Sequence, residues 1–305
     1  MGGRSAMDGL RRLARALVVV GLFGGAAVTA TFYVVSRTDE LAEDRLRLSA
    51  ERAPLPEAFA PRYGRWLRTV IGSGLTDFGQ SHTGPVRDVL IDRLPVTAAI
   101  GLLSWAAGWG SGLALATLLA TRWRDFAEFH QRRVYPIAHA VPALVVVILA
   151  YLALVQVDPR PGRWLRTAVG ILSLTVLLVP STTALWLNGM LRVLGREFVR
   201  VARARGTPPV ALWMRHVLPN VIVSSGVPTQ AAFSLAGLLV GSAFVEGVFR
   251  LGGVAEVFIE GATRGQAELA GFATLAYFLV TAVGVLLAEG VAIYLDPTGE
   301  VRRED

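Results

Sequence analysis

Long apolar stretches, separated by polar segments, recur along most of this chain. A helix crosses the hydrocarbon core of a membrane with roughly 20 mainly apolar residues. Six stretches reach that length, so we expect an all-α, polytopic membrane protein with six transmembrane helices. The predicted spans are residues 16–35, 96–120, 134–157, 167–189, 221–245 and 269–295.

The polar segments between these spans divide the chain into parts. A short N-terminal end (1–15) precedes the first span, and a long polar segment (36–95) follows it. Residues 96–295 then form the predicted membrane core, interrupted by an arginine-rich loop at 190–219, and residues 296–305 form the tail. The first span is predicted to be retained rather than removed as a signal peptide, because no clear small-residue cleavage site follows it.

Arginine placement predicts the orientation of the spans. Positive charge in short loops marks the cytoplasmic side, and arginines cluster before the first span, after the second and in residues 190–219. The short turn with Arg160, Arg163 and Arg166 opposes this orientation but is outweighed by the other short loops. Long segments such as 36–95 translocate largely regardless of charge. We therefore expect both termini and the 190–219 loop to be cytoplasmic, and residues 36–95 to be external.

Composition narrows the function classes. Only 17% of residues are charged and 53% are hydrophobic, whereas soluble domains carry about 25% charged residues. The net charge of +7 comes with arginines that flank apolar spans, which argues against nucleic acid as a partner and favours membrane lipid. The chain has no cysteine, and its four histidines lack the spacing of a metal site. All 30 basic residues are arginine, so no P-loop lysine is present and ATP would be hydrolysed by another polypeptide.

The arginine-rich loop contains the passage EFVRVARARGTPPVALWMRHVLPN, residues 197–220. Two stripes are predicted on one helix, a basic stripe and an apolar stripe. The basic stripe is Arg192, Arg196, Arg200 and Arg203, and the apolar stripe is Leu194, Phe198 and Val201.

The same passage carries signals for a turn and a second helix. Gly206 is suited to end the first helix, Thr207 to cap a second one and Pro208 to begin it. The second helix is predicted over residues 208–218, with Pro219 interrupting it. We call residues 196–219 the elbow.

The residues alone leave three interpretations of the elbow. It can rest on anionic lipid as a basic amphipathic helix, or dock its apolar stripe into a groove of another protein. DNA binding is the third interpretation, and it is disfavoured because spans tether the elbow on both sides.

The elbow resembles the EAA loop of ABC importer permeases. In that pattern a Glu-Ala-Ala-like triplet precedes a glycine by three residues, and nine further residues lead to Ile-x-Leu-Pro. Here the triplet is Arg-Val-Ala at 200–202, and Gly206, Leu218 and Pro219 fall at the matching spacing. The glutamate and the isoleucine of the pattern are absent.

Other stretches resemble the dipeptide/oligopeptide branch of these permeases, and fit best its B-type subunit. They are the basic start RRLARALVVVGLF, the segment TDFGQS with RLPVTAAIGLL after it, SAFVEGVFRLGGVAE and the closing LDP. The branch's usual PGDP after the first span is missing, and RLGGVAE lacks its usual tryptophan-proline. The resemblance covers most of the chain.

The resemblance implies a type I ABC importer permease fold in a bacterial inner membrane, with several partners. A second homologous permease subunit would form the translocation path with this chain. Cytoplasmic ABC ATPase subunits would carry ATP and Mg, bind the elbow as a coupling helix and supply all catalysis, with no catalytic residue, metal or cofactor in this chain. An external substrate-binding protein would deliver cargo to residues 36–95 and 246–268. Peptides are the expected cargo, with nickel or haem as alternatives.

Specific residues carry these expectations. For the ATPase contact, the expected groove contacts are Phe198, Val201 and Ala202, and the expected polar contacts are Arg200 and Arg203. Gly206 forms the turn, and Leu218 and Pro219 complete the expected coupling residues. Polar residues within spans are candidates to line the path, although small polar residues also join helices. The path candidates are Thr229, Gln230 and Ser234. Glu246, near a predicted span end, is expected at the membrane interface.

Two other classes remain as alternatives. A self-contained channel or secondary transporter predicts intramembrane carboxylates or an internal repeat, and neither is clear here. A membrane enzyme predicts catalytic residues that converge near one face, and the sequence shows no such set.

Overall fold

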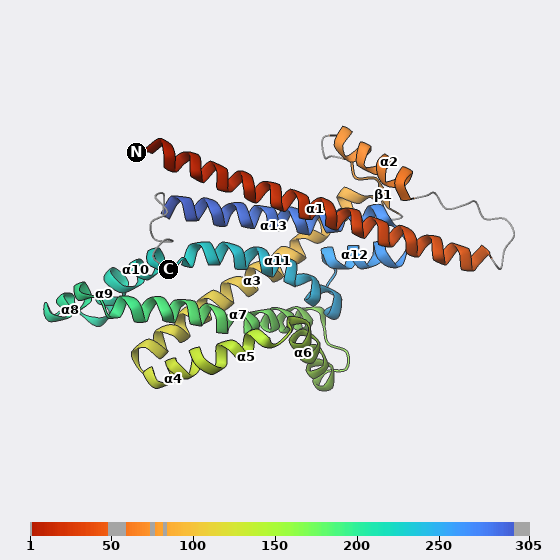
Figure 1. Ribbon diagram of the computed structural model, residues 1–305. Helices are drawn as coiled ribbons and strands as arrows, with labels where there is room; N and C mark the ends of the chain where they lie inside the picture. Colours follow the sequence, from red (N-terminus) through yellow and green to blue (C-terminus); the bar gives the residue numbers. More distant parts are fainter. Residues whose placement is uncertain (1, 48–58, 74–76, 82–83, 296–305) are drawn as a thin grey trace. The chain divides into compact units, whose positions relative to one another are not determined.

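The computed structural model describes residues 2–47, 59–73, 77–81 and 84–295, and these ranges are almost entirely helical (Figure 1). The N-terminal helices are α1 (Gly2–Arg47), α2 (Phe59–Gly72), α3 (Val86–Thr121), α4 (Arg124–Phe129), α5 (Tyr135–Ala140) and α6 (Ala143–Val157). The later ones are α7 (Arg163–Leu194), α8 (Glu197–Ala204), α9 (Pro209–Leu212), α10 (Leu218–Ser224), α11 (Val227–Phe249), α12 (Val254–Thr263) and α13 (Ala267–Leu295). Two π-helical turns, η1 (His130–Val134) and η2 (Trp213–Val217), and the short antiparallel strands β1 (Gln80–Ser81) and β2 (Gly84–Pro85) complete the described parts.

The predicted six-span, all-α architecture is confirmed, with one change of shape. Within the described ranges, five helical segments are long and apolar enough to cross a membrane, and a sixth counts if a bent pair forms one span. The five are Leu17–Arg37, Val86–Thr121, Arg163–Leu194, Val227–Phe249 and Ala267–Leu287.

The bent pair is the predicted third span, which we expected as one helix over 134–157. Arg124–Ala140 and Ala143–Val157 meet instead at an angle of 81°. Pro142 explains the break, because a proline pushes the preceding residue towards extended backbone. Val141 has φ −80° and ψ 121°, which ends α5, and α6 begins after the proline.

The chain divides into two compact units. The first contains Gly101–Leu238 together with both chain ends, and the second contains Leu17–Ile100 and Leu239–Ala282. In the first unit, Trp186, Leu187 and Met190 of α7 are buried against Val217 and Val221. Glycines permit close helix contact there: a Cβ on Gly112 would lie within 2.8 Å of Cβ of Thr182.

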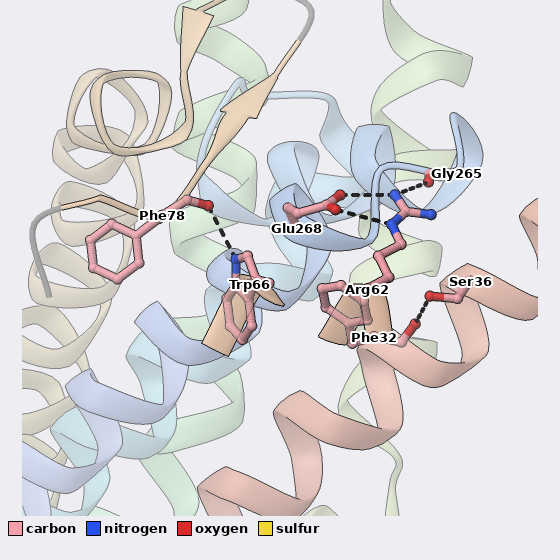
Figure 2. A network of polar contacts seen from close by, with 7 residues as sticks. All are labelled: Phe32, Ser36, Arg62, Trp66, Phe78, Gly265 and Glu268. Atoms are coloured by element: carbon pink, nitrogen blue, oxygen red, sulfur yellow. Dashed lines mark hydrogen bonds and ion pairs between the residues drawn. The ribbon is translucent and has the colours of Figure 1, made fainter. Parts of the chain in front are cut away.

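The second unit is built around an aromatic cluster that joins α2 and Phe78 to α13. The rings of Phe78 and Phe272 stack with centroids 3.6 Å apart. Figure 2 shows the hydrogen bond that Trp66 Nε1 donates to the carbonyl of Phe78 at 3.1 Å. Arg62 of α2 donates two hydrogen bonds to the carboxylate of Glu268 on α13, from Nε to Oε1 at 3.0 Å and from Nη2 to Oε2 at 2.9 Å. α2 and Phe78 are therefore fixed to the start of α13 by packing and by a bidentate ion pair.

Candidate functional site: the elbow and a polar pocket

The first helix of the elbow is separate from α7. α7 ends at Leu194, and α8 begins at Glu197 after Gly195 and Arg196, with Arg196 in extended backbone at φ −72° and ψ 149°. The prediction of one continuous basic stripe from Arg192 to Arg203 is therefore wrong. The extended backbone of Arg196 interrupts the helix, so Arg192 belongs to α7, whereas Arg200 and Arg203 belong to α8.

The turn at Gly206 closes α8 as the sequence predicts. Gly206 N–H donates to the carbonyl of Arg203 at 2.9 Å, and Thr207 N–H donates to that of Ala202 at 3.2 Å. Gly206 has φ +77°, the left-handed region that glycine adopts without a Cβ clash. These two hydrogen bonds form a Schellman motif, which satisfies carbonyls at the end of α8.

The glycine's conformation makes a testable prediction. Gly206→Ala should destabilise the turn by about 1–2 kcal/mol, because an L side chain in the left-handed region clashes with the following carbonyl. Limited trypsin digestion at the exposed Arg203 and Arg205 should then be several-fold faster, since local opening exposes the chain. Gly195→Ala is the matched control, because Gly195 has φ −79° and only ordinary contacts. Equal digestion rates for the two variants would contradict the prediction.

The second half of the elbow differs from prediction in two details. Its helix begins at Pro209 rather than Pro208, because Pro208 has extended backbone at φ −56° and ψ 144° and occupies the cap position. Pro219 does not interrupt it. α9, η2 and α10 follow one another with helical backbone at their junctions, and the wide π turn of η2 directly precedes Leu218 and Pro219. A π turn is a known way for a helix to absorb such a local irregularity.

The two faces of α8 have different surroundings. Val199 and Ala202 are buried in the core of the first unit, whereas Phe198 and Val201 are 41% and 49% exposed. Arg200 and Arg203 are also exposed, and Arg200 lies 3.7 Å from Glu197. Ala202, which we expected in the partner's groove, faces the wrong way for that contact.

Beyond α8, the structure adds apolar residues that the sequence analysis did not single out. Val210 of α9 and Met214 of η2 are 75% and 60% exposed, so the second half of the elbow also carries exposed apolar side chains. Leu218 is half-buried and Pro219 is exposed. The residue spacing along α8 could not predict the exposure of Val210 and Met214, because the direction of their side chains depends on the turn at Gly206.

A polar pocket lies within the first unit, with a volume of about 300 Å³. It is built by α3, α5, α7 and α11. Its lining residues are Trp109, Tyr135, His139, Leu178, Ser181, Thr182, Ala184, Leu185, Asn188, Gln230 and Ser234. Two of the three predicted path residues, Gln230 and Ser234, are in this lining, whereas Thr229 is not.

Ser234 is held by two tryptophans. Its Oγ accepts from Trp105 Nε1 at 3.2 Å and from Trp109 Nε1 at 2.9 Å, and it donates to the carbonyl of Ala231 at 2.9 Å. These bonds link α3 to α11 inside the first unit. Ser234 therefore positions the pocket's wall, and its hydroxyl has little hydrogen-bonding capacity left for a ligand.

Glu246, which we expected at the membrane interface, lies near the end of α11 and is fully buried in the second unit. Its Oε1 accepts from Ser242 Oγ, and its Oε2 from the Ala255 N–H, both at 2.9 Å. The Ala255 bond caps the first turn of α12, and Val254 N–H donates to Thr97 Oγ1 at 3.0 Å beside it. Within the described ranges, no group of three or more His, Asp or Glu side chains is placed to hold a metal ion.

Comparison with known proteins gives one family and a set of relatives. Residues 96–298 match the family described as binding-protein-dependent transport system inner membrane component. The oligopeptide transport system permease protein OppB of Mycobacterium bovis is 25% identical over 261 residues, covering 77% of this chain and 79% of that protein. The dipeptide transport system permease protein DppB of Bacillus subtilis is 24% identical over 244 residues, covering 77% and 78%.

A solved structure shares the fold. A chain of the structure described as "Crystal structure of an amino acid ABC transporter with histidines" superposes with a TM-score of 0.54 at 18% identity. The match covers 67% of this chain and 93% of that one. At this identity the likeness establishes the architecture of the membrane helices.

Proposed function

The chain belongs to the family of binding-protein-dependent transport system inner membrane components, and from this premise we propose that it is a peptide-translocating permease subunit of an ATP-driven ABC importer. Relatives named as oligopeptide and dipeptide permeases, matched over 77% of the chain, support peptides as the cargo. These names favour peptides over nickel or haem. They also favour a subunit of a transport system over a self-contained channel.

The partners follow from the same proposal. A second homologous permease completes the path, cytoplasmic ABC ATPase subunits bind ATP and Mg, and an external binding protein delivers the peptide. We assign both termini and the elbow to the cytoplasmic side, an orientation that the arginine-rich loops support. Residues 36–95, anchored through Arg62 and Glu268, lie outside with α12 and offer a surface to the binding protein.

The observation that carries the proposal is the outward face of the elbow. Phe198 and Val201 project from a short helix whose other side is locked into the first unit by Val199 and Ala202. Such an element, capped by a rigid turn, can enter a groove on an ATPase and transmit its movement to α7 and α10. In the importer cycle, ATP binding would favour one access state of the permease pair over the other.

The test is co-purification with the partner subunits. We expect Phe198→Asp with Val201→Asp to release the ATPase and to abolish peptide transport, because two carboxylates cannot enter an apolar groove without a partner. Val157→Asp is the matched control, since Val157 is 87% exposed in the first unit but lies far along the chain from the elbow. Retention of the ATPase by the double variant would show that the elbow is not the coupling surface.

A further inference from the structure

The polar pocket of the first unit has a lining without fixed charge. It contains two carboxamides (Asn188, Gln230), three aliphatic hydroxyls (Ser181, Thr182, Ser234), the phenol of Tyr135 and the rings of Trp109 and His139, with no carboxylate or guanidinium among its lining residues. A charged group entering such a pocket would lose water without gaining a counterion, which is costly. The lining therefore selects uncharged groups that carry both donors and acceptors.

The three aliphatic hydroxyls already donate to backbone carbonyls. Ser181 Oγ donates to Leu178 at 2.9 Å, and Ser234 Oγ to Ala231 at 2.9 Å. Thr182 Oγ1 lies 3.1 Å from the carbonyl of Gly108 on α3. These side chains build the wall, and their hydrogens are directed at the helices rather than at the pocket.

The two carboxamides, in contrast to the hydroxyls, make no hydrogen bonds to the described backbone. Asn188 on α7 and Gln230 on α11 are both exposed to the pocket, and their side chains have no hydrogen-bond partner in the part of the chain that the structure describes. Each carboxamide offers one acceptor oxygen and two N–H donors. A peptide bond offers one N–H and one carbonyl, so it can exchange hydrogen bonds with either carboxamide or bridge the two.

We propose that Asn188 and Gln230 form a subsite that binds an uncharged backbone amide of the peptide in transit, while Trp109 and Tyr135 offer aromatic faces to the adjoining side chain. This rests on the proposed peptide transport and adds the chemistry of one step in the path. The volume of about 300 Å³ is at the small end of ligand pockets, so the subsite receives a short part of a peptide at a time. Recognition of the amide, present in every peptide, leaves the subsite tolerant of sequence.

The subsite makes a charge-specific prediction. Asn188→Asp and Gln230→Glu keep the size of each side chain but add a carboxylate, which repels an acidic peptide and attracts a basic one. In vesicles containing the complete transporter, we expect Ala-Glu-Ala uptake to fall about tenfold while Ala-Lys-Ala uptake falls less than about twofold. Asn188→Leu and Gln230→Leu should instead slow Ala-Ala-Ala, Ala-Glu-Ala and Ala-Lys-Ala alike, by about fivefold, as each loses one hydrogen bond.

The controls separate this subsite from the transport proposal. Gln156→Leu removes an exposed carboxamide on α6 outside the pocket and should leave uptake unchanged. Binding-protein-stimulated ATPase activity should persist in all pocket variants. If the wild-type transporter takes up these peptides and the pocket variants do so equally fast, the subsite is overturned and the transport proposal stands. If the wild-type transporter takes up none of the three peptides, both the transport proposal and the subsite proposal are contradicted.

Discussion

Replacing Glu246 with alanine is expected to destabilise the second unit by about 3 kcal/mol. The change removes the acceptor for the Ala255 N–H and for Ser242 Oγ, both in fully buried positions. It also removes Oε2 from the hydroxyl of Tyr277, 3.4 Å away. A buried donor left without its partner costs about 1–3 kcal/mol, and this applies to the Ala255 N–H, whereas Ser242 Oγ still has the carbonyl of Leu239 within 2.7 Å. The loss of side-chain volume adds a cavity.

Thermal unfolding of the purified protein in detergent measures this effect. The unfolding midpoint of Glu246→Gln should lie between those of the wild type and Glu246→Ala. The amide oxygen of glutamine still accepts a hydrogen bond, but its NH₂ group replaces an acceptor with a donor that faces other donors. Glu256→Ala is the matched control: Glu256 lies on α12 near Arg93, its side chain is 43% exposed, and loss of this surface pair costs little. If Glu246→Ala unfolds at the same midpoint temperature as the wild type, the carboxylate does not stabilise the second unit.

The position of the Glu246 carboxylate also explains why residue 253 is a glycine. A Cβ on Gly253 would collide with the Glu246 carboxylate and would lie 2.8 Å from Thr97 Oγ1. The turn Leu-Gly-Gly-Val therefore needs glycine at 253 so that α12 can begin directly on the carboxylate. The proposed binding-protein surface at residues 246–268 thus depends on a buried residue for its placement.

Local signals in the sequence predicted some of these features well. The spans follow from length and hydropathy because a helix must keep about 20 apolar residues in the hydrocarbon core. Gly206 was predictable because a helix end is decided by a few neighbouring residues. The bend at Val141 was not, since apolar residues lie on both sides of Pro142 and hydropathy does not distinguish a straight span from a bent one.

Features that depend on distant residues could not be predicted. Glu246 meets Tyr277, which is 31 positions away in sequence, and only the packed structure brings them together. The same holds for Asn188, which lies 42 positions before Gln230 yet shares its pocket. The direction of Ala202 was missed because Val199 and Ala202 form the inward face of α8, whereas the apolar stripe of the sequence pointed to Phe198 and Val201. The roles of the elbow residues in ATPase binding stay predictions.

Gly189→Leu is expected to destabilise the first unit strongly. A Cβ at position 189 would collide with Ser225 Oγ and lie 2.7 Å from Cγ1 of Val221, so α7 and α10 touch at this point. A leucine would force the helices apart, at a cost of about 3 kcal/mol or more. Thermal unfolding should show a large fall in the midpoint. Gly110→Leu is the control, because a Cβ on Gly110 meets nothing within 4 Å and leucine favours helix.

The smaller substitution Gly189→Ala should reduce transport more than it reduces stability. Asn188 in the pocket precedes Gly189, and α10 continues directly from the elbow, so their contact joins the proposed ATPase docking surface to the proposed path. An extra methyl group at this contact alters how α7 and α10 move together while leaving a folded chain. We expect peptide uptake per ATP hydrolysed to fall about threefold with the ATPase still bound, whereas a merely structural contact would lower stability and leave that ratio unchanged.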